Sequence, residues 1–480
     1  MRRGAVGVTK QKRNRSVERY LDRMAIVSQG CSVLYFIVRV SAQQRADMLR
    51  FEKGGKRVDK LLIRGAVVID PASQYQETQD VLVADGMIAA RGKQLSCPDA
   101  AVMDAEGLVC IPGLVDIHVH LRDPGQTHKE DILSGCRAAA AGGITSVACM
   151  PNTSPACDLP ETVHYIKQTA RQASAHVYPI AAATRSLAGE ELTDLRSLHS
   201  AGAVAVSDDG RPVATAALMK TVMETAAALG VPVLAHCEEL SLVQGGIMNE
   251  GTVSRSLGVP GISRAAEDVG TAREIALAAA TGCPVHICHV STRGSVELIR
   301  DARRRGVPVT GETAPHYFYL TDECLRKRDA DYRMNPPLRT EEDRQAIIEG
   351  LRDGTLEIVA TDHAPHAAAE KADFDRAPNG AVGLETSLAV GITALVHPGY
   401  LTLMQLVEKM SLNPARLLHL PAGTLEVGAQ ADLVLLDPQA SWVVEPDKLH
   451  GKSHNTPFKG EKLYGRIKAT LLGGKIVYRG

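Results

Sequence analysis

The chain has 480 residues, of which 45% are hydrophobic and 23% are charged, an ordinary globular composition with ample length for a large core. Its net charge of −1 argues against a general nucleic-acid binder, because phosphate binding needs a basic face. Aromatic residues make up only 4%, so the apolar content is mostly aliphatic, which suits helices packed on a parallel sheet.

The first 57 residues differ in charge from the rest of the chain. Between Arg2 and Arg57 there are 14 Lys or Arg against 4 Asp or Glu, a net charge of +10 that leaves about −11 for the remainder. The apolar run Cys31–Val38 is far shorter than the ~20 residues of a membrane span, and no small-residue cleavage site of a secretion signal follows it. We expect residues 1–57 to be a disordered or spurious extension, with the real start near Met48. An organelle-import segment is the alternative.

Residues 58–110 and 421–480 have the pattern of β-structure. The predicted strands and hairpins are Leu61–Asp70, Val81–Ala90 about an Asp85-Gly86 turn, Ala431–Asp437, and Ala469–Arg479 about a Gly473-Gly474 turn. Two β-rich ends that flank one long middle predict a small β-sandwich domain built from both chain ends.

Residues 111–420 alternate between strand and helix patterns. The predicted strands are Leu114–His118, Ile144–Met150, His176–Ala181, Ala203–Ser207, Val231–His236, Val285–His289, Val307–Thr313 and Glu357–Asp362. The predicted helices include Lys129–Ala141, Thr215–Leu229, Arg264–Ala280 and Thr292–Arg305, and left-handed caps are expected at Gly142, Gly230, Gly282 and Gly306. Eight such units predict a closed (β/α)8 TIM-type barrel. A doubly wound open sheet is the alternative, but it would favour a Gly-rich nucleotide loop after the first strand, and none is found.

The cysteines indicate a reducing compartment rather than a disulfide framework. They are Cys31, Cys97, Cys110, Cys136, Cys149, Cys157, Cys237, Cys283, Cys288 and Cys324. None forms a C-x-x-C pair, and several lie in apolar strand patterns, where a reduced thiol acts as a small hydrophobe. We therefore expect a cytoplasmic protein.

The stretch Asp116–Gly125 is the most informative part of the sequence. His118 and His120 are two residues apart at the end of an apolar run, so on a β-strand both imidazoles lie on one face. Two neutral imidazoles at a strand end can bind one divalent metal ion. Arg122 is the next cation and is placed to hold an anionic substrate beside that metal.

In a barrel of this kind the chemistry lies at the carboxyl ends of the strands. The polar residues at those ends include His118, His120, Asn152, Asp208, Asp209, His236, His289 and Asp362. His286 and His289 are three residues apart, so only one of them faces inward, and we choose His289 because it is nearer the end. By the same alternation, His363 points away from Asp362. A lone strand-end histidine is more often structural than a ligand. Four His and two Asp together are too many for one tetrahedral zinc and suit two metals with a bridging carboxylate.

Five motifs, in order along the chain, resemble those of class I dihydroorotase, a family of the metal-dependent amidohydrolase superfamily. They are Asp116–Thr127, Cys149–Thr153, Ser207–Gly210, Met334–Arg339 and Ala360–His366. The resemblance covers about residues 58–480. It implies a zinc enzyme with two metal ions per subunit.

The resemblance also implies a role for each site residue. His118, His120 and Asp362 would bind one zinc, His236 and His289 would bind the other, and Asp209 would bridge them, where many relatives have a carbamylated lysine. The residues expected to contact the substrate are His120, Arg122, Asn152, Asn335, His366, Asn379 and Gly380. The loop after strand eight, residues 363–383, would either cover the substrate or be an ordinary barrel connection.

The implied reaction is the reversible closure of N-carbamoyl-L-aspartate to L-dihydroorotate in pyrimidine biosynthesis, with Asp362 as the catalytic acid and base. An allantoinase or hydantoinase is the first alternative, and Arg122 and Asn152 argue against it because they suit a carboxylate. A non-catalytic scaffold for aspartate transcarbamoylase is the second, and the full ligand set argues against it. The resemblance still allows association with that transcarbamoylase, and it allows a homo-oligomer.

Overall fold

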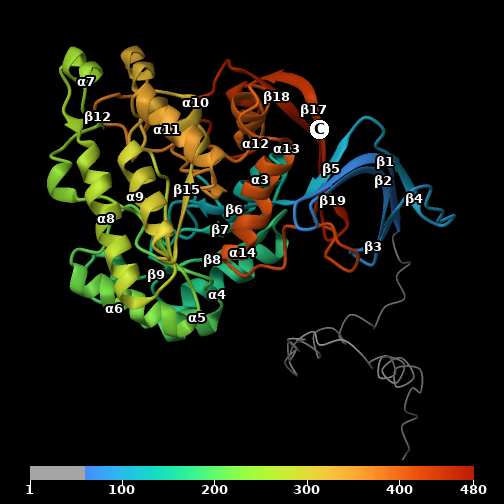
Figure 1. Cartoon of the computed structure of the whole chain (residues 1–480), viewed down its shortest axis with the longest axis horizontal. Coiled ribbons are helices and arrows are strands. Elements are labelled where there is room, and N and C mark those ends of the chain that lie inside the picture. Colours follow the sequence, from blue (N-terminus) through green and yellow to red (C-terminus); the bar gives the residue numbers. More distant parts are fainter. Residues whose placement is uncertain (1–59) are drawn as a thin grey trace, which may run out of the picture. The chain divides into compact units, whose positions relative to one another are not determined.

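The computed structural model describes residues 60–480 (Figure 1). The expectations for residues 1–57 and for a start near Met48 lie outside the described residues. Among the described helices, none is long and apolar enough to cross a membrane.

Eight parallel strands form the barrel, with the third strand divided into β8 and β9. The strands are β6 (Leu114–Val119), β7 (Ile144–Cys149), β8 (His176–Pro179) with its continuation β9 (Ala181–Ala182), β10 (Val206–Ser207), β11 (Val233–Ala235), β14 (Val285–Ile287), β15 (Val309–Thr313) and β16 (Ile358–Val359). They pair in the orders β6-β7-β8 and β9-β10-β11-β14-β15-β16. A parallel bridge between Val119 and His363 joins the first strand to the last, with His120 N donating to His363 O at 2.8 Å. The closed barrel is therefore confirmed, and the open-sheet alternative is excluded.

Helices follow the strands and cover the outside of the barrel (Figure 1). The longer ones are α3 (Ile132–Ala141), α4 (Pro160–Thr169), α5 (Leu195–Ala201), α6 (Ala216–Leu229), α8 (Arg264–Thr281), α9 (Arg293–Arg304) and α11 (Glu341–Arg352). Short helices are α7 (Thr252–Leu257), α10 (Pro315–Tyr319), α12 (Ser387–Gly391), α13 (Leu403–Val407) and α14 (Asn413–Leu417). The side chains of Asp131, Thr215, Ser263 and Thr292 accept hydrogen bonds from the first turns of α3, α6, α8 and α9, which fixes where these helices begin.

Three of the four predicted glycine caps are left-handed, and one prediction is wrong. Gly230, Gly282 and Gly306 have φ of 71°, 71° and 77°, whereas Gly142 has φ −86° and the left-handed residue is Gly143, at 82°. Gly142 is needed for a different reason, because a Cβ there would lie 2.0 Å from the carbonyl oxygen of Leu384.

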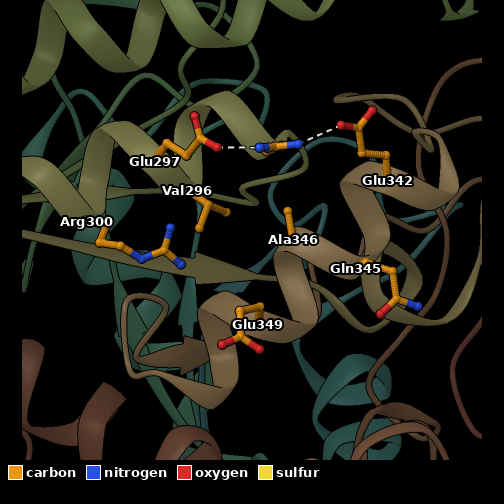
Figure 2. Close-up of a pocket in the computed structure, with 8 residues that line it drawn as sticks. Val296, Glu297, Arg300, Glu342, Gln345, Ala346 and Glu349 are labelled. Atoms are coloured by element: carbon orange, nitrogen blue, oxygen red, sulfur yellow. Dashed lines mark hydrogen bonds and ion pairs between the residues drawn. The ribbon is translucent and has the colours of Figure 1, made fainter.

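A groove runs between α9 and α11 on the outer surface of the barrel (Figure 2). Arg293 lies between two carboxylates there, 2.8 Å from Glu297 and 2.7 Å from Glu342. These ion pairs are exposed and add little to stability.

Both chain ends contribute to one sheet, as predicted. Its strands are β1 (Leu61–Asp70), β2 (Tyr75–Ala84), β3 (Met87–Gly92), β4 (Ala101–Asp104), β5 (Val109–Pro112), β17 (Leu433–Val443), β18 (Lys462–Leu472) and β19 (Lys475–Arg479), in the order β19-β18-β17-β5-β1-β2-β3 with β4 on β1. The predicted hairpin turn has φ of 53° at Asp85 and 76° at Gly86. Ile88 N donates to Ala429 O at 2.9 Å, which brings β3 back to the chain before β17. The sheet thus curls around a core that includes Ile63, Val81 and Leu433.

The nine cysteines of the described residues are free thiols, and seven are buried, as expected of small apolar side chains.

Candidate metal centre and active site

The six predicted metal ligands lie together at the carboxyl ends of the barrel strands. They are His118 and His120 at β6, Asp209 after β10, His236 after β11, His289 after β14 and Asp362 after β16, and all are buried. The barrel therefore assembles, from residues up to 244 positions apart, a single group of nitrogen and oxygen donors.

Asp209 is at the centre of this group. Its Oδ1 lies 3.4 Å from His118 Nε2, 3.5 Å from His236 Nδ1 and 3.4 Å from His289 Nε2. Its Oδ2 lies 3.5 Å from His120 Nε2. Burial alone would raise the pKa of Asp209, but the charge of His118 and the close approach of the His236 and His289 rings hold it well below its ordinary value. The carboxylate is therefore ionised and faces donors on both sides.

The donors fall into two sets that share Asp209. One set is His118, His120 and Asp209, and the other is Asp209, His236 and His289, with the donor atoms of each set within 4.8 Å of one another. Asp362 Oδ1 extends the first set, 3.2 Å from His120 Nε2 and 3.6 Å from His118 Nε2.

Two of these atoms lack any other partner. His118 Nε2 and Asp209 Oδ1 are buried and have no hydrogen bond to another of residues 60–480. Buried polar atoms are almost always satisfied, so a cation in each donor set fits the residues present.

Three of the four histidines have an oxygen acceptor on the ring nitrogen that faces away from Asp209. His118 Nδ1 lies 2.7 Å from Glu312 Oε1, His120 Nδ1 lies 2.8 Å from Asn152 Oδ1, and His236 Nε2 lies 3.3 Å from Glu238 Oε2. Such acceptors fix the tautomer and leave the other nitrogen free to bind a metal.

Glu312 and Glu238 are not among the residues predicted from the sequence. Glu312 Oε2 also accepts from His286 Nε2 at 3.1 Å, so His286 belongs to this outer layer while His289 faces Asp209. The inward choice of His289 thus agrees with its position in the structure. The only sequence signal for Glu312 was a carboxylate within the apolar strand pattern 307–313.

Three site residues have left-handed backbone conformations that are unusual for non-glycine residues. The φ values are 58° at Arg122, 37° at His289 and 48° at Asp362. Such strain persists only where the surroundings enforce it, and it is concentrated at functional sites. Asp116 provides part of that support beside Asp362, because its carboxylate accepts from Thr361 Oγ1 at 2.6 Å and from Thr361 N at 3.2 Å.

Arg122 is buried beside the loop that follows β16. Its Nε donates to Pro365 O at 3.2 Å, and its Nη2 lies 3.4 Å from His366 Nε2. Within the described part of the chain, Arg122 has no carboxylate at ion-pair distance. A buried guanidinium without a counter-charge suits an anionic ligand.

His366 and Asn379 lie next to Arg122. His366 Nε2 donates to Asn379 O at 2.8 Å. Burial, with Arg122 nearby, lowers the pKa of His366 to about 3, so its ring is neutral. The Oδ1 of Asn379 is buried without a hydrogen-bond partner among the residues described.

The backbone of Gly380 already has partners within the protein. Its N–H donates to Arg333 O at 2.8 Å, and its carbonyl accepts from Lys371 Nζ and Asn455 Nδ2, each at 3.0 Å. Lys371 Nζ also donates to Pro378 O at 2.9 Å. These bonds hold the loop of residues 363–383 in place, which favours a fixed wall over a mobile cover.

A cavity of about 560 Å³ opens beside Asp209. Its lining includes Gln126, Asn152, Ser154, Asp158, Asp209 and Arg211. The cavity thus adjoins Asn152 and Asp209 of the predicted site.

Comparisons with known proteins agree with this geometry. Residues 107–295 match a family model described as "Dihydro-orotase-like", and residues 344–478 match one described as "Amidohydrolase family". The dihydroorotase of Geobacter metallireducens is 50% identical over 422 residues, which cover 87% of this chain and 99% of that protein, and the dihydroorotase of Acetivibrio thermocellus is 50% identical over 421 residues, with the same coverage.

Solved structures show the same architecture. The L-hydantoinase of Arthrobacter aurescens is similar with a TM-score of 0.79 and 26% identity, covering 88% of this chain and 96% of that one. The dihydropyrimidinase of Brevibacillus agri has a TM-score of 0.78 and 27% identity, covering 88% and 95%. Because the identity to the two dihydroorotases extends over nearly their whole length, the chain belongs to the dihydroorotase family of metal-dependent amidohydrolases.

Proposed function

We propose that the protein is a dihydroorotase, which interconverts N-carbamoyl-L-aspartate and L-dihydroorotate in pyrimidine biosynthesis. The observation that carries the proposal is the buried Arg122, without a carboxylate partner in residues 60–480, beside two donor sets that share Asp209. A cyclic amide with a carboxylate substituent fits that combination. Metal ions held by the donors would polarise the amide carbonyl, and the guanidinium would bind the carboxylate.

The donor chemistry supports zinc as the metal, with two ions per subunit. His118, His120 and Asp362 would hold one ion, His236 and His289 the other, and Asp209 both. Mixed imidazole and carboxylate donors are typical of zinc sites. When bound, the ions lower the pKa of a water molecule and polarise the ring amide carbonyl.

Asp362 is the proposed acid and base. In the hydrolytic direction its carboxylate takes the proton of the attacking water and passes it to the leaving ring nitrogen. In the biosynthetic direction Asp362 must begin protonated, so ring closure is favoured at lower pH. Its Oδ1 lies 3.2 Å from His120 Nε2, beside the donor set that would hold the first metal ion.

Arg122, Asn152 and His366 are the proposed carboxylate site. Arg122 offers a planar pair of N–H donors, and Asn152, whose oxygen faces His120, still has its amide N–H₂ to donate. Asn335 and Asn379 would contact the remaining polar groups of the ring, and Gly380 would shape the wall. His120 would contact the substrate on the side that faces the metal ions.

The test is metal analysis of the purified protein combined with an ultraviolet assay of dihydroorotate loss. We expect about two zinc ions per subunit and turnover of dihydroorotate, with little turnover of hydantoin, allantoin or dihydrouracil. Turnover of a neutral cyclic substrate without dihydroorotate would reject the proposal in favour of a hydantoinase type. A cytoplasmic location, a homo-oligomer and association with aspartate transcarbamoylase stay predictions, and co-elution at micromolar concentration tests the last two.

A further inference from the structure

One carboxylate joins a candidate metal ligand to a candidate substrate residue. Glu238 follows β11 two residues after His236, and its Oε2 lies 3.3 Å from His236 Nε2. The same oxygen lies 3.3 Å from Asn335 Nδ2. Glu238 is not among the residues that the sequence motifs single out.

This contact determines which end of the Asn335 amide faces the carboxylate. An ionised carboxylate only accepts hydrogen bonds, and an amide has one donor end and one acceptor end. Asn335 must therefore turn its Nδ2 toward Glu238 and its Oδ1 away from it. That Oδ1 is buried and has no hydrogen-bond partner elsewhere in the described chain.

A buried, unsatisfied amide oxygen costs free energy unless a ligand supplies a donor. Asn335 lies near the metal centre, because Glu238 bonds both to it and to His236. A hydrogen-bond donor on a molecule held at this centre would satisfy Asn335 Oδ1.

We propose that Glu238 is a positioning residue that fixes Asn335 as a hydrogen-bond acceptor for an N–H group of the substrate, while it holds His236 with Nδ1 toward Asp209. The inference rests on the proposed function. Dihydroorotate has ring N–H groups, and N-carbamoyl-aspartate has ureido N–H groups, so both forms of the substrate provide the donor. In Glu238→Gln the neutral amide could instead donate to Asn335 Oδ1, and Asn335 would then present its N–H₂ to the substrate.

A double-mutant cycle tests the coupling. The variants are Glu238→Gln, Asn335→Leu and the double variant, with Glu239→Gln as the matched control, because that neighbouring carboxylate accepts from Ser241 N and touches neither partner. KM and kcat for dihydroorotate, bound zinc and the thermal midpoint are measured for each. We expect Asn335→Leu to raise KM about tenfold, the value of one hydrogen bond, with zinc content unchanged.

We expect Glu238→Gln alone to raise KM by a similar factor. When Asn335 is already Leu, the same substitution should raise KM by less than threefold. If the KM of the double variant rises by the product of the two single-variant factors, the proposal is overturned. An unchanged KM in Glu238→Gln also overturns it. If Glu238→Gln acts only by lowering bound zinc and kcat, Glu238 serves His236 alone, and the proposal is likewise overturned.

A second measurement covers the case in which Glu238→Gln does not fold. Wild-type protein should discriminate against ring N-methylated dihydroorotate, and Asn335→Leu should lose at least part of that discrimination. Equal discrimination by both proteins would contradict the proposal. Failure of the wild type to turn over dihydroorotate would instead refute the proposed function, and the same cycle would then be run with whichever of hydantoin or dihydrouracil it does turn over, since both carry ring N–H groups.

Discussion

His118 Nδ1 lies 2.7 Å from Oε1 of Glu312, a fully buried carboxylate on β15. The other oxygen of Glu312 accepts from His286, and the backbone N of His289 lies 3.4 Å from Oε1. One carboxylate thus supports a donor from each of the two sets around Asp209. β15, the seventh barrel strand, contributes no donor to either set. It supports both sets through the Glu312 side chain.

Replacing Glu312 by Gln should weaken metal binding. The loss of the charged acceptor frees His118 to adopt the other tautomer, and changes of this kind typically cost 10- to 100-fold in metal affinity. Zinc retention during titration with a competing chelator measures the effect. The exposed Glu297→Gln is the control, and zinc retention equal to that of the control would contradict the supporting role.

Asp362→Asn should retain the fold and most of the metal but lose turnover. An amide cannot take and return the proton, and general acid–base groups contribute ~10²- to 10⁴-fold. Steady-state kcat with parallel zinc analysis provides the check. A variant with the wild-type rate would remove Asp362 from the proton-transfer role.

Arg122→Met should raise KM for dihydroorotate by about 30- to 150-fold, or roughly 2–3 kcal/mol for a lost charge-assisted contact. Weak turnover of neutral dihydrouracil, where it is measurable, should change much less because that ring has no carboxylate. The exposed Arg255→Met serves as the control. An unchanged KM would place the carboxylate site elsewhere.

Asn455→Ala should destabilise the protein and impair substrate binding. The Asn455 side chain accepts from His366 N and donates to Gly380 O, both at 3.0 Å. Its removal leaves the His366 N–H without its acceptor, at a cost of about 1–3 kcal/mol, whereas the Gly380 carbonyl keeps its bond from Lys371 Nζ. Urea unfolding measures the loss, and a KM increase with zinc content unchanged would identify the effect on the substrate wall. Wild-type stability would show that these bonds are replaced by water.

The stability contribution of Lys371 should depend on pH. Burial lowers its pKa from 10.5 to about 8. Between pH 8 and 10.5 the unfolded chain therefore binds more protons at this side chain than the folded protein, so its contribution to stability rises with pH, by about 3 kcal/mol in total. The measurement is the difference in unfolding free energy between wild type and Lys371→Met from pH 7 to 10.5. A difference that stays flat across this range would contradict the expected titration.

Much of the barrel could be predicted because its strands are apolar runs that end in polar residues. Each of the eight predicted strands overlaps a strand of the structure, although β10 and β16 have only two residues each. The order of strand ends then places His118, His236 and Asp362 on one edge, since the carboxyl ends of parallel strands share an edge.

Other features depend on pairing across the fold and could not be predicted locally. Glu312 reaches His118 across 194 positions, and no periodicity within either segment indicates this contact. The left-handed φ of His289 and Asp362 is imposed by their surroundings rather than by residue type. At Gly142 and Gly143 a cap was predicted one residue too early, because two adjacent glycines satisfy different constraints.

The position of Asn455 also bears on how the enzyme is made. It lies between β17 and β18, near the end of the chain, yet its side chain fastens the wall beside His366. A growing polypeptide on the ribosome can therefore complete all eight barrel strands and still lack a finished binding site. The last segment to be synthesised completes it. The same segment carries Phe458, Leu463 and Ile467 of the barrel core, so proteins cut short within it would lose both the wall and part of that packing.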